Sequence, residues 1–568
     1  MSTPFSLERW RRRVRVALGE EPADLVIAGG QVADVFSEAL VAADVAIADG
    51  VIAGVGDYPG GRERIEAEGA IVAPAFIDAH IHTESSLLWL PEFARAVVPR
   101  GTGAVVTDPH EIANVAGLPG LSAMRAAAAG LPLDVRFTVP SCVPASPRET
   151  PGAEFGPADI AGMLAWPETA ALGELMNFPG VLAGDSAIGD RLAAASGRAI
   201  DGHAPGLTGR ALQAYAGSGP GSDHESTTLD EAAEKIRAGL MVMIRQGSSA
   251  KNLAALLPLA SDPVTAARVC LCSDDRDAHD LHQHGHMDAT LREAIALGLD
   301  PLRAIRLATW NAAAYWRMPG LGAVAPRYRA NLAIIRDLRA MTVSMTLHDG
   351  RVVAADGETL SPIPRLADIP APLRDTVRIA PILSRDLRLP EADARQAVVA
   401  IPGQIVTGLE EVEPTVVDGF AVSDPARDLL KLVCVERHHA SGRIGKGLVR
   451  GFGLRRGAMA SSIAHDAHNL VAVGCTDADL LAAIATVADS GGGLAVVADG
   501  SVIEHLPLPI AGLLSDQPLA ETAAAYGRLE RAARDLGSSL PSPFGLLAFM
   551  ALSVIPRARV TDQGFITL

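Results

Sequence analysis

FIDAHIHTESS, residues 76 to 86, is an apolar run that ends abruptly in two histidines, His80 and His82, with only Ile81 between them. Side chains at positions i and i+2 of a strand point to the same face, so both imidazoles should project together from the tip of a buried strand. Two imidazoles on one face can bind one metal ion. Such a pair alone is weak support for a metal site, so the prediction depends on what the rest of the chain places beside it.

The same arrangement recurs along the chain as a short apolar run, a polar tip and a longer stretch of helical composition. Eight such steps occur, at residues 75–82, 103–111, 135–142, 170–177, 199–206, 221–226, 240–247 and 268–275. Eight alternating β and α units over about 240 residues match the usual size of a (β/α)₈ barrel, whose chemistry lies at the carboxyl ends of the strands. The sixth run, GSDHES, has almost no apolar body, so we expect a short strand there and a distorted barrel.

The segments before and after this barrel have a different pattern of apolar runs and turn residues. Residues 24–74 and 318–366 alternate short β-rich runs with Gly and Asp turn signals, which predicts a small discontinuous β-sandwich domain interrupted by the barrel at 75–317. Residues 1–23 read as an N-terminal helix. Beyond residue 380 the β-rich runs flank helical stretches, which predicts an additional C-terminal α/β domain over 380–568.

Composition limits the partners of the chain. Its 568 residues carry a net charge of −17, which disfavours binding to nucleic acid or anionic lipid. The longest uncharged apolar stretch, residues 544–555, is too short to cross a bilayer. Five cysteines in so long a chain form no disulfide framework and favour a reducing cytoplasm. We therefore expect a cytoplasmic protein with a small-molecule ligand and no nucleic-acid or membrane partner.

Metal-ligand side chains follow the other strand tips. Glu174 follows the fourth run, His203 the fifth and His224 the sixth, and Asp274 with Asp275 ends the eighth. With Asp274 as the carboxylate of the eighth run, they and the first histidine pair give six imidazole and carboxylate ligands on one rim, too many for one tetrahedral ion, so two metals such as Mn, Fe or Zn are expected. Two adjacent cations need a bridging anion, and no lysine occurs before Lys235 that could supply a carboxylated bridge. Glu174 can bridge as an ordinary carboxylate.

At this point the chain resembles the adenine deaminase family within the amidohydrolase superfamily. The matching stretches include FIDAHIHTESS, GTGAVVTDPHEIANV, LGELMNFPGV, IDGHAPGL, SDHESTT, MIRQGSSAKNL, LCSDDR and, near the C-terminus, RIGKGLVRGFGLRRGAMASSIAHDAHNL. The resemblance extends over nearly the whole chain. Most amidohydrolases lack the C-terminal part, so that part separates this family from dihydroorotases and hydantoinases.

The resemblance implies a ligand set and a reaction. The ligands are His80, His82, His203, His224, the bridging Glu174 and the strand-eight carboxylate Asp274. The implied cofactors are two divalent ions, Mn or Fe with Zn as an alternative, that share a hydroxide. The implied reaction is hydrolytic deamination of free adenine to hypoxanthine and ammonia, in purine salvage or catabolism, by a homo-oligomer of two or more chains.

Further residues have expected roles in that reaction. Asp274 should move a proton from the attacking water to the departing nitrogen, beside His224. Glu84 or Glu111 should protonate the ring nitrogen N1.

Other polar residues have less specific expectations. Asp108 and His110 should orient the metal ligands. Asp275 either reads the purine edge or pairs with Arg276. A polar cluster in the last domain either closes over the site, binds a further metal or forms an interdomain hydrogen-bond network; its members are His465, Asp466, His468 and Asn469. The pair His438 and His439 leaves the same alternatives open.

Two other functions stay open at the level of sequence. A cyclic-amide hydrolase of the dihydroorotase or hydantoinase type would use the same ligands to open a ring. A non-catalytic barrel relative would typically have lost some of the six ligands. The zinc deaminases that act on flipped bases carry an H-x-E and P-C-x-x-C signature, which does not occur here.

Overall fold

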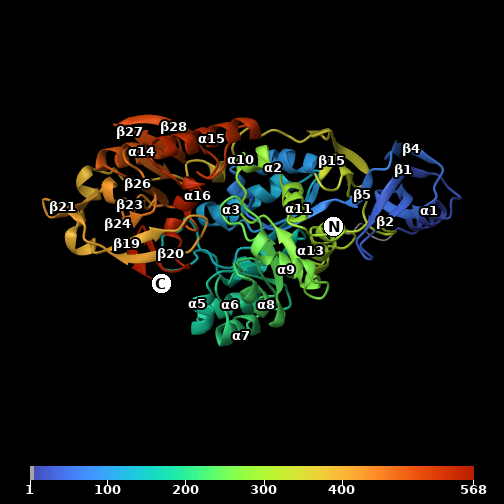
Figure 1. The fold of residues 1–568 in the computed structure, drawn as a ribbon, viewed down its shortest axis with the longest axis horizontal. Coiled ribbons are helices and arrows are strands. Elements are labelled where there is room, and N and C mark those ends of the chain that lie inside the picture. Colours follow the sequence, from blue (N-terminus) through green and yellow to red (C-terminus); the bar gives the residue numbers. More distant parts are fainter. Residues whose placement is uncertain (1–5, 568) are drawn as a thin grey trace.

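The computed structural model describes residues 6–567, and its centre is the predicted distorted (β/α)₈ barrel (Figure 1). Each of the eight predicted runs overlaps a strand. The strands are β6 (Phe76–Ile81), β7 (Thr102–Thr107), β8 (Asp134–Val139), β9 (Thr169–Leu175), β10 (Ile200–Gly202), β11 (Ser222–Asp223), β12 (Met241–Arg245) and β13 (Val269–Cys272). They form two parallel sheets, in the orders β6-β7-β8-β9-β10 and β11-β12-β13. The two-residue β11 is the shortened sixth strand expected from GSDHES.

A few backbone hydrogen bonds join the two sheets into a barrel. On one side the Gly221 N–H donates to the Ile200 carbonyl at 2.9 Å. On the other, the Asp274 N–H donates to the His80 carbonyl and the His82 N–H donates to the Asp274 carbonyl, both at 3.0 Å. Asp274 has φ +58°, in the left-handed region that Asp adopts more readily than most residues. Closure of the barrel therefore sets Asp274 directly against the histidine pair.

Helices surround these strands, and four of them, α5 to α8, gather in the lower lobe of Figure 1. The helices of this region are α2 (Leu90–Val97), α3 (His110–Ala128), α4 (Pro157–Leu164), α5 (Phe178–Ala183), α6 (Ser186–Ala194), α7 (Gly209–Gly217), α8 (Leu229–Arg237), α9 (Leu253–Ser261), α10 (Ala278–Gln283), α11 (Met287–Ala296), α12 (Pro301–Leu307) and α13 (Trp310–Tyr315). Every residue of β6, β7 and β12 is buried, as is usual for parallel strands covered by helices on their outer face.

Strands from before and after the barrel share one further sheet, at the right of Figure 1. Its strands are β1 (Ala23–Asp34), β2 (Ala39–Ala48), β3 (Val51–Gly56), β4 (Gly61–Glu66), β5 (Ile71–Pro74), β14 (Leu332–Asp337), β15 (Thr342–His348), β16 (Arg351–Ala355) and β17 (Glu358–Thr359). Antiparallel pairing of β5 with β14 joins the two segments, so all nine strands form one continuous hydrogen-bonded sheet. Helix α1 (Leu7–Ala17) packs on it through Val16, and Arg12 pairs with Asp24 and Asp49.

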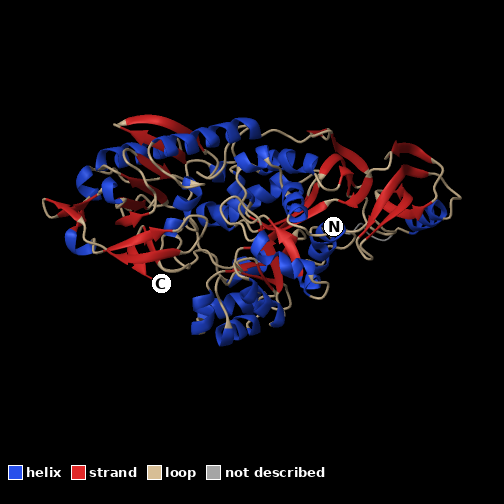
Figure 2. Ribbon diagram, viewed as in Figure 1, coloured by secondary structure: helices blue, strands red, loops and turns tan. Residues whose placement is uncertain are grey.

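The C-terminal part is built on an eight-stranded sheet in the order β20-β19-β24-β23-β26-β25-β27-β28, at the left of Figures 1 and 2. Its strands are β19 (Gln396–Ala400), β20 (Thr407–Glu411), β23 (Leu430–Val435), β24 (Ile444–Arg450), β25 (Ala458–Ser461), β26 (Leu470–Gly474), β27 (Gly493–Ala498) and β28 (Ser501–Pro507). The smaller pieces are β18 (Leu389–Pro390), β21 (Thr415–Val417), β22 (Phe420–Val422), β29 (Ala558–Thr561) and β30 (Gly564–Thr567).

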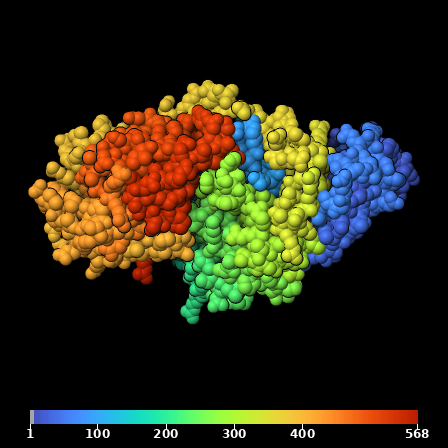
Figure 3. All heavy atoms as spheres, turned by 45° about the horizontal axis from the view of Figure 1, so that its top comes forward, coloured from blue at the N-terminus to red at the C-terminus, as the bar shows by residue number. Residues whose placement is uncertain are grey.

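Three helices, α14 (Asp477–Asp489), α15 (Leu519–Asp535) and α16 (Pro543–Ala548), belong to this C-terminal part. Helix α15 packs against the barrel helix α10, and in the space-filling view the C-terminal part lies directly against the barrel (Figure 3). All five cysteines are free. Among residues 6–567, no helix is both long enough and apolar enough to span a bilayer. The exact residue boundaries of the N-terminal helix, the small β-domain, the barrel and the C-terminal domain stay predictions.

Candidate active site

The six predicted ligands meet at the carboxyl ends of the barrel strands. His80 Nε2 and His82 Nε2 lie 3.2 Å apart, and Asp274 Oδ1 is 3.5 Å from the first and 3.2 Å from the second. All three side chains are buried. The strand geometry read from the sequence thus brings both imidazoles to one face, and barrel closure adds the carboxylate of strand eight.

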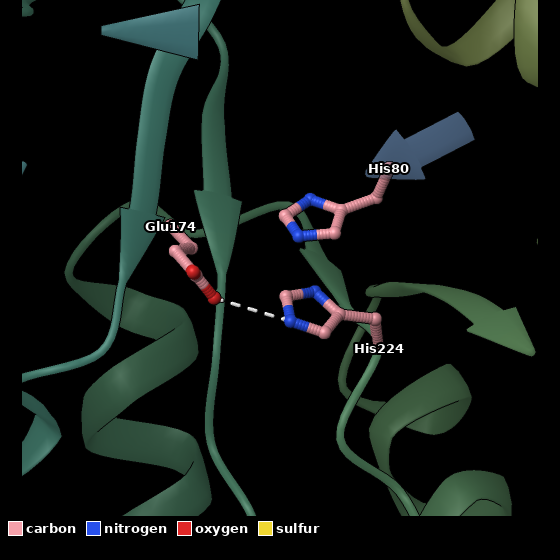
Figure 4. A group of neighbouring side chains, drawn as sticks. All are labelled: His80, Glu174 and His224. Atoms are coloured by element: carbon pink, nitrogen blue, oxygen red, sulfur yellow. Dashed lines mark ion pairs between the residues drawn. The ribbon is translucent and has the colours of Figure 1, made fainter. Parts of the chain in front are cut away.

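Glu174, at the end of β9, faces different histidines with its two oxygens. Its Oε2 lies 2.8 Å from His203 Nδ1 and 3.1 Å from His224 Nε2, whereas its Oε1 lies 3.4 Å from His82 Nε2. Figure 4 shows Glu174 pointing toward the rings of His224 and His80, which stack with centroids 3.9 Å apart. One carboxylate therefore touches both halves of the ligand set, as a bridge between two cations would.

The donor set fits divalent cations. His80, Glu174 and His224 present ligand atoms within 4.8 Å of one another, and so do His80, His82 and Asp274. His203 Nε2 and His224 Nδ1 are buried and have no hydrogen-bond or ion-pair partner in residues 6–567. Buried polar atoms normally have a partner, so these nitrogens indicate that a ligand belongs there. Imidazole and carboxylate donors suit Mn, Fe and Zn.

Opposite charges control ionisation in this cluster. Burial raises the pKa of Glu174, but His203 and the other imidazoles outweigh it and hold that pKa well below its usual range. Burial lowers the pKa of His82, yet the carboxylates Asp274 and Glu174 raise it to about 10. The same competition raises the pKa of His203 to about 9. Protons thus compensate the carboxylates when no cation is bound, and cation binding would release them.

Outer hydrogen bonds orient the first two ligands. His80 Nδ1 donates to Asp201 Oδ2 at 2.8 Å, and His82 Nδ1 donates to the Asp108 carbonyl at 2.9 Å. With Nδ1 engaged outward, both Nε2 atoms are left facing the centre, in the tautomer that binds a metal. Asp201 was missed from the sequence, although its position two residues before His203 in IDGH is a usable signal.

Asp108 and His110 lie directly beside the ligands, where they were expected to orient them. Asp108 Oδ2 accepts the Glu174 backbone N–H at 2.8 Å. His110 Nδ1 lies 3.3 Å from Glu174 Oε1, and its Nε2 lies 3.4 Å from Asp466 Oδ1 of the C-terminal part. His110 therefore connects Glu174 to the C-terminal part.

Arg245 and Glu225 form a second layer that the sequence prediction missed. Arg245, the last residue of β12, donates hydrogen bonds to both carboxyl oxygens of Glu225 through its two terminal nitrogens. Its Nη1 also lies 2.7 Å from Asp274 Oδ2. Glu225 Oε1 in turn lies 3.6 Å from His224 Nε2. Burial raises the pKa of Asp274, but the Arg245 charge outweighs it and holds that pKa well below its usual range. The signals were an arginine at a strand tip and a glutamate next to His224.

The two predicted acids are both buried, but they have different contacts. Glu84 accepts the Ile112 backbone N–H at 3.4 Å and the Thr83 hydroxyl at 3.2 Å. Glu111 lies 3.2 Å from the Ser85 hydroxyl and 3.5 Å from His465 Nδ1. Burial raises the pKa of both carboxyl groups, and for Glu111 the charge of Glu84 raises it further.

Two members of the C-terminal cluster reach the barrel mouth. His465 and Asp466 line the cavity that five of the six predicted ligands also line, together with apolar side chains of the same domain such as Phe549. His468 Nδ1 accepts the Ala464 backbone N–H at 3.2 Å, a contact inside the domain. Asn469 donates to the Thr150 carbonyl at 3.0 Å, an interdomain bond.

The pair His438 and His439 binds backbone rather than the metal ligands. His438 Nε2 lies 2.7 Å from the Ala467 carbonyl, and His439 Nε2 lies 3.0 Å from the Pro151 carbonyl. Of these two contacts, only the second crosses to the barrel.

Comparison with known proteins agrees with this architecture. Residues 71–353 match the model of the amidohydrolase family, and residues 404–568 match that of the adenine deaminase C-terminal domain. The adenine deaminase of Dehalococcoides mccartyi is 46% identical over 554 residues, covering 97% of this chain and 96% of that protein. Adenine deaminase 2 of Carboxydothermus hydrogenoformans is 43% identical and covers 97% of each chain. The adenine deaminase of Halalkalibacterium halodurans is 41% identical, covering 98% and 96%.

A distorted (β/α)₈ barrel with imidazole and carboxylate ligands gathered at its strand tips defines a metal-dependent hydrolase of the amidohydrolase type. The C-terminal domain and the nearly full-length similarity narrow this class. The chain belongs to the adenine deaminase family.

Proposed function

We propose that this protein hydrolyses free adenine to hypoxanthine and ammonia. One observation carries the proposal. The C-terminal domain that distinguishes the family places His465, Asp466 and Phe549 in the same cavity as five of the six predicted barrel ligands, His82, Glu174, His203, His224 and Asp274. The substrate chamber is therefore made by two domains, and an ordinary cyclic-amide hydrolase of the superfamily would lack one of its walls.

His80, His82, Glu174, His203, His224 and Asp274 are the residues proposed to hold two divalent ions, Mn or Fe. Bound there, the ions would supply activated water at neutral pH for attack on C6 of the base. The oxygen and nitrogen donors suit either metal. The outer contacts of Asp201 and Arg245 keep the ligands aimed at the centre.

Asp274 is proposed to move the proton that the leaving group needs. Its Oδ1 faces the histidine pair while Arg245 holds Oδ2, so one oxygen is fixed and the other points to the reacting centre. A carboxylate kept this acidic gives up a proton readily once it has accepted one from water. The amino group then departs as ammonia.

The attacking water has two protons. One leaves with ammonia, and the other accounts for the proton that N1 gains, because hypoxanthine carries N1–H. Of the two predicted acids, Glu111 is the better placed to protonate N1. It contacts His465, which lines the substrate chamber, and Ser85, which lines the adjoining cavity, whereas the carboxyl oxygens of Glu84 are bound to Ile112 and Thr83.

Incubation of the protein, loaded with Mn(II) or Fe(II), with adenine tests the proposal. We expect release of ammonia together with the absorbance change from adenine to hypoxanthine. Parallel assays with a hydantoin and with dihydroorotate test the ring-opening alternative. Ring opening without adenine turnover would refute deamination, and a protein that turns over none of these substrates would favour the non-catalytic alternative.

We also propose a cytoplasmic location in purine metabolism and a homo-oligomeric state. The free cysteines support the first. The second rests on family resemblance, and sedimentation velocity of the purified protein tests it, with a single monomeric species as the outcome that contradicts it.

A further inference from the structure

Two cavities meet beside the metal ligands. The first is lined by five of the six predicted ligands, and the second extends between the barrel and the C-terminal domain, past Ser85, Tyr526 and Phe544. Three residues line both cavities: Asp275, His465 and Phe549. A molecule whose reacting atom sits at the ligands would reach this junction with its far end.

Asp275 offers a free acceptor at the junction. The Ser85 hydroxyl lies against its Oδ1, and the Ser248 N–H donates to its backbone carbonyl at 2.8 Å. Within residues 6–567, its Oδ2 has no hydrogen-bond or ion-pair partner, and the pairing with Arg276 that the sequence left open is not formed. One oxygen is thus fixed by Ser85, and the other is available to a ligand.

The neighbouring wall is aromatic. His465 stacks on Phe549 with ring centroids 4.6 Å apart and planes 19° apart, which gives the junction a flat side. A planar heterocycle packs well against such a surface. Among the three residues that line both cavities, the junction therefore combines an aromatic wall with one carboxylate, Asp275.

We propose that Asp275 accepts a hydrogen bond from the ring N–H of the imidazole half of the purine and so restricts the enzyme to free bases. The inference rests on the proposed function, because C6 must face the metal ligands for the imidazole half to reach the junction. In adenine, C6 and the N9–H group lie at opposite ends of the fused rings. A nucleoside carries a sugar in place of that hydrogen, so it would leave the carboxylate without its donor.

The preference for a free base over an analogue that lacks this N–H should be large. A site built around a hydrogen bond from a substrate N–H can reject an analogue that lacks it by about 10⁴-fold, because its own polar group is left unpaired. Loss of one charge-assisted hydrogen bond should lower kcat/KM for adenine by about 10- to 100-fold.

The test measures kcat/KM for adenine and inhibition constants for hypoxanthine, 7-methylhypoxanthine and 9-methylhypoxanthine, with the wild type, Asp275→Ala and Asp275→Asn. Asp34→Asn is the matched control, because Ser37 donates to Asp34 at 2.5 Å, far from the site, as Ser85 does to Asp275. We expect the wild type to bind hypoxanthine more tightly than at least one methylated base, and Asp275→Ala to lose that preference together with 10- to 100-fold in kcat/KM. The control should behave as the wild type.

Steric exclusion alone would leave the preference unchanged in Asp275→Ala, and this result would overturn the proposal. Equal binding of all three bases by the wild type would also overturn it. Failure of the wild type to deaminate adenine is a separate outcome that refutes the proposed function instead. The asparagine variant keeps the shape of the side chain, so a defect in the alanine variant that comes only from misfolding would be absent from it.

Discussion

Glu174 and His203 extend from the tips of neighbouring strands and meet, with Glu174 Oε2 2.8 Å from His203 Nδ1. The other oxygen of Glu174 faces His82, which comes from the opposite end of the five-stranded sheet. The carboxylate thus reaches across the barrel mouth. This position makes Glu174 the group whose alteration should affect both proposed cations together.

Replacing Glu174 with glutamine should lower metal content and rate together. The amide removes the negative charge that would bridge two cations, so we expect metal content to fall by roughly half or more. Metal analysis and adenine turnover on the same preparation check this. Glu168→Gln is the control, because Glu168 precedes the same strand and pairs with Arg125 outside the site. Retention of full metal content and full activity in Glu174→Gln would exclude the bridging role.

Replacing Asp274 with asparagine should reduce turnover more than metal content. Asparagine tolerates the left-handed backbone at this position and keeps an oxygen donor, but it cannot accept and return a proton. We expect a loss of about 10²- to 10⁴-fold in kcat. The exposed Asp57→Asn should behave as wild type. Near-normal kcat in Asp274→Asn would assign proton transfer to another group.

Replacing Arg245 with methionine should destabilise the metal-free protein. Two buried carboxylates, Glu225 and Asp274, would lose their counter-ion, and breaking a buried pair in this way costs about 3–5 kcal/mol. Urea denaturation followed by circular dichroism measures the loss. Arg450→Met, which breaks a partly exposed pair with Glu410, should cost about 1 kcal/mol or less. Equal stability of the two variants would show that Arg245 is not the counter-ion of this layer.

The contact between α10 and α15 should make stability depend on pH. Burial, then the charge of Asp277, raises the pKa of Glu530 to about 7, while burial and Asp280 raise that of Asp277 to about 6. Glu530 also lies near Arg534, and Asp277 lies near His279. Because folding raises these two pKa values, the neutral carboxyl groups contribute stability to the folded protein. This contribution is fully present below the ordinary carboxyl pKa near 4 and is lost as the pH rises through about 6 to 7.

Replacement of Glu530 with glutamine should therefore stabilise the protein relative to the wild type, and this gain should be larger at pH 8 than at pH 5. Unfolding temperatures of the variant and the wild type at both pH values measure this difference. Glu521→Gln, at an exposed position of the same helix, should show no such difference. The same shift in both variants would contradict the assignment.

Local rules carried much of the site prediction. The i, i+2 geometry of a strand placed His80 and His82 together, and polar tips after apolar runs located Glu174, His203 and His224, because parallel strands of a barrel end on one rim. These inferences need only periodicity and strand direction. The two-residue β11 was foreseen for the same reason, since GSDHES has no apolar body.

Contacts between distant segments were beyond those rules. Arg245 reaches Glu225 and Asp274 because β12 lies between β11 and β13, and the sequence does not show which way so long a side chain turns. The position of His465 over the barrel depends on how two domains pack, which depends on many weak apolar contacts rather than on a motif. The hydrogen bond that His80 donates to Asp201 joins β6 to β10, at opposite ends of the five-stranded sheet, and no local pattern predicts it.

The most direct test of the central claim, that six residues scattered along the sequence form one site for two cations, is metal analysis of the folded wild-type protein. After loading with Mn(II) or Fe(II) and removal of free metal, the account predicts about two ions per chain. A folded protein that retains no metal under these conditions would contradict it.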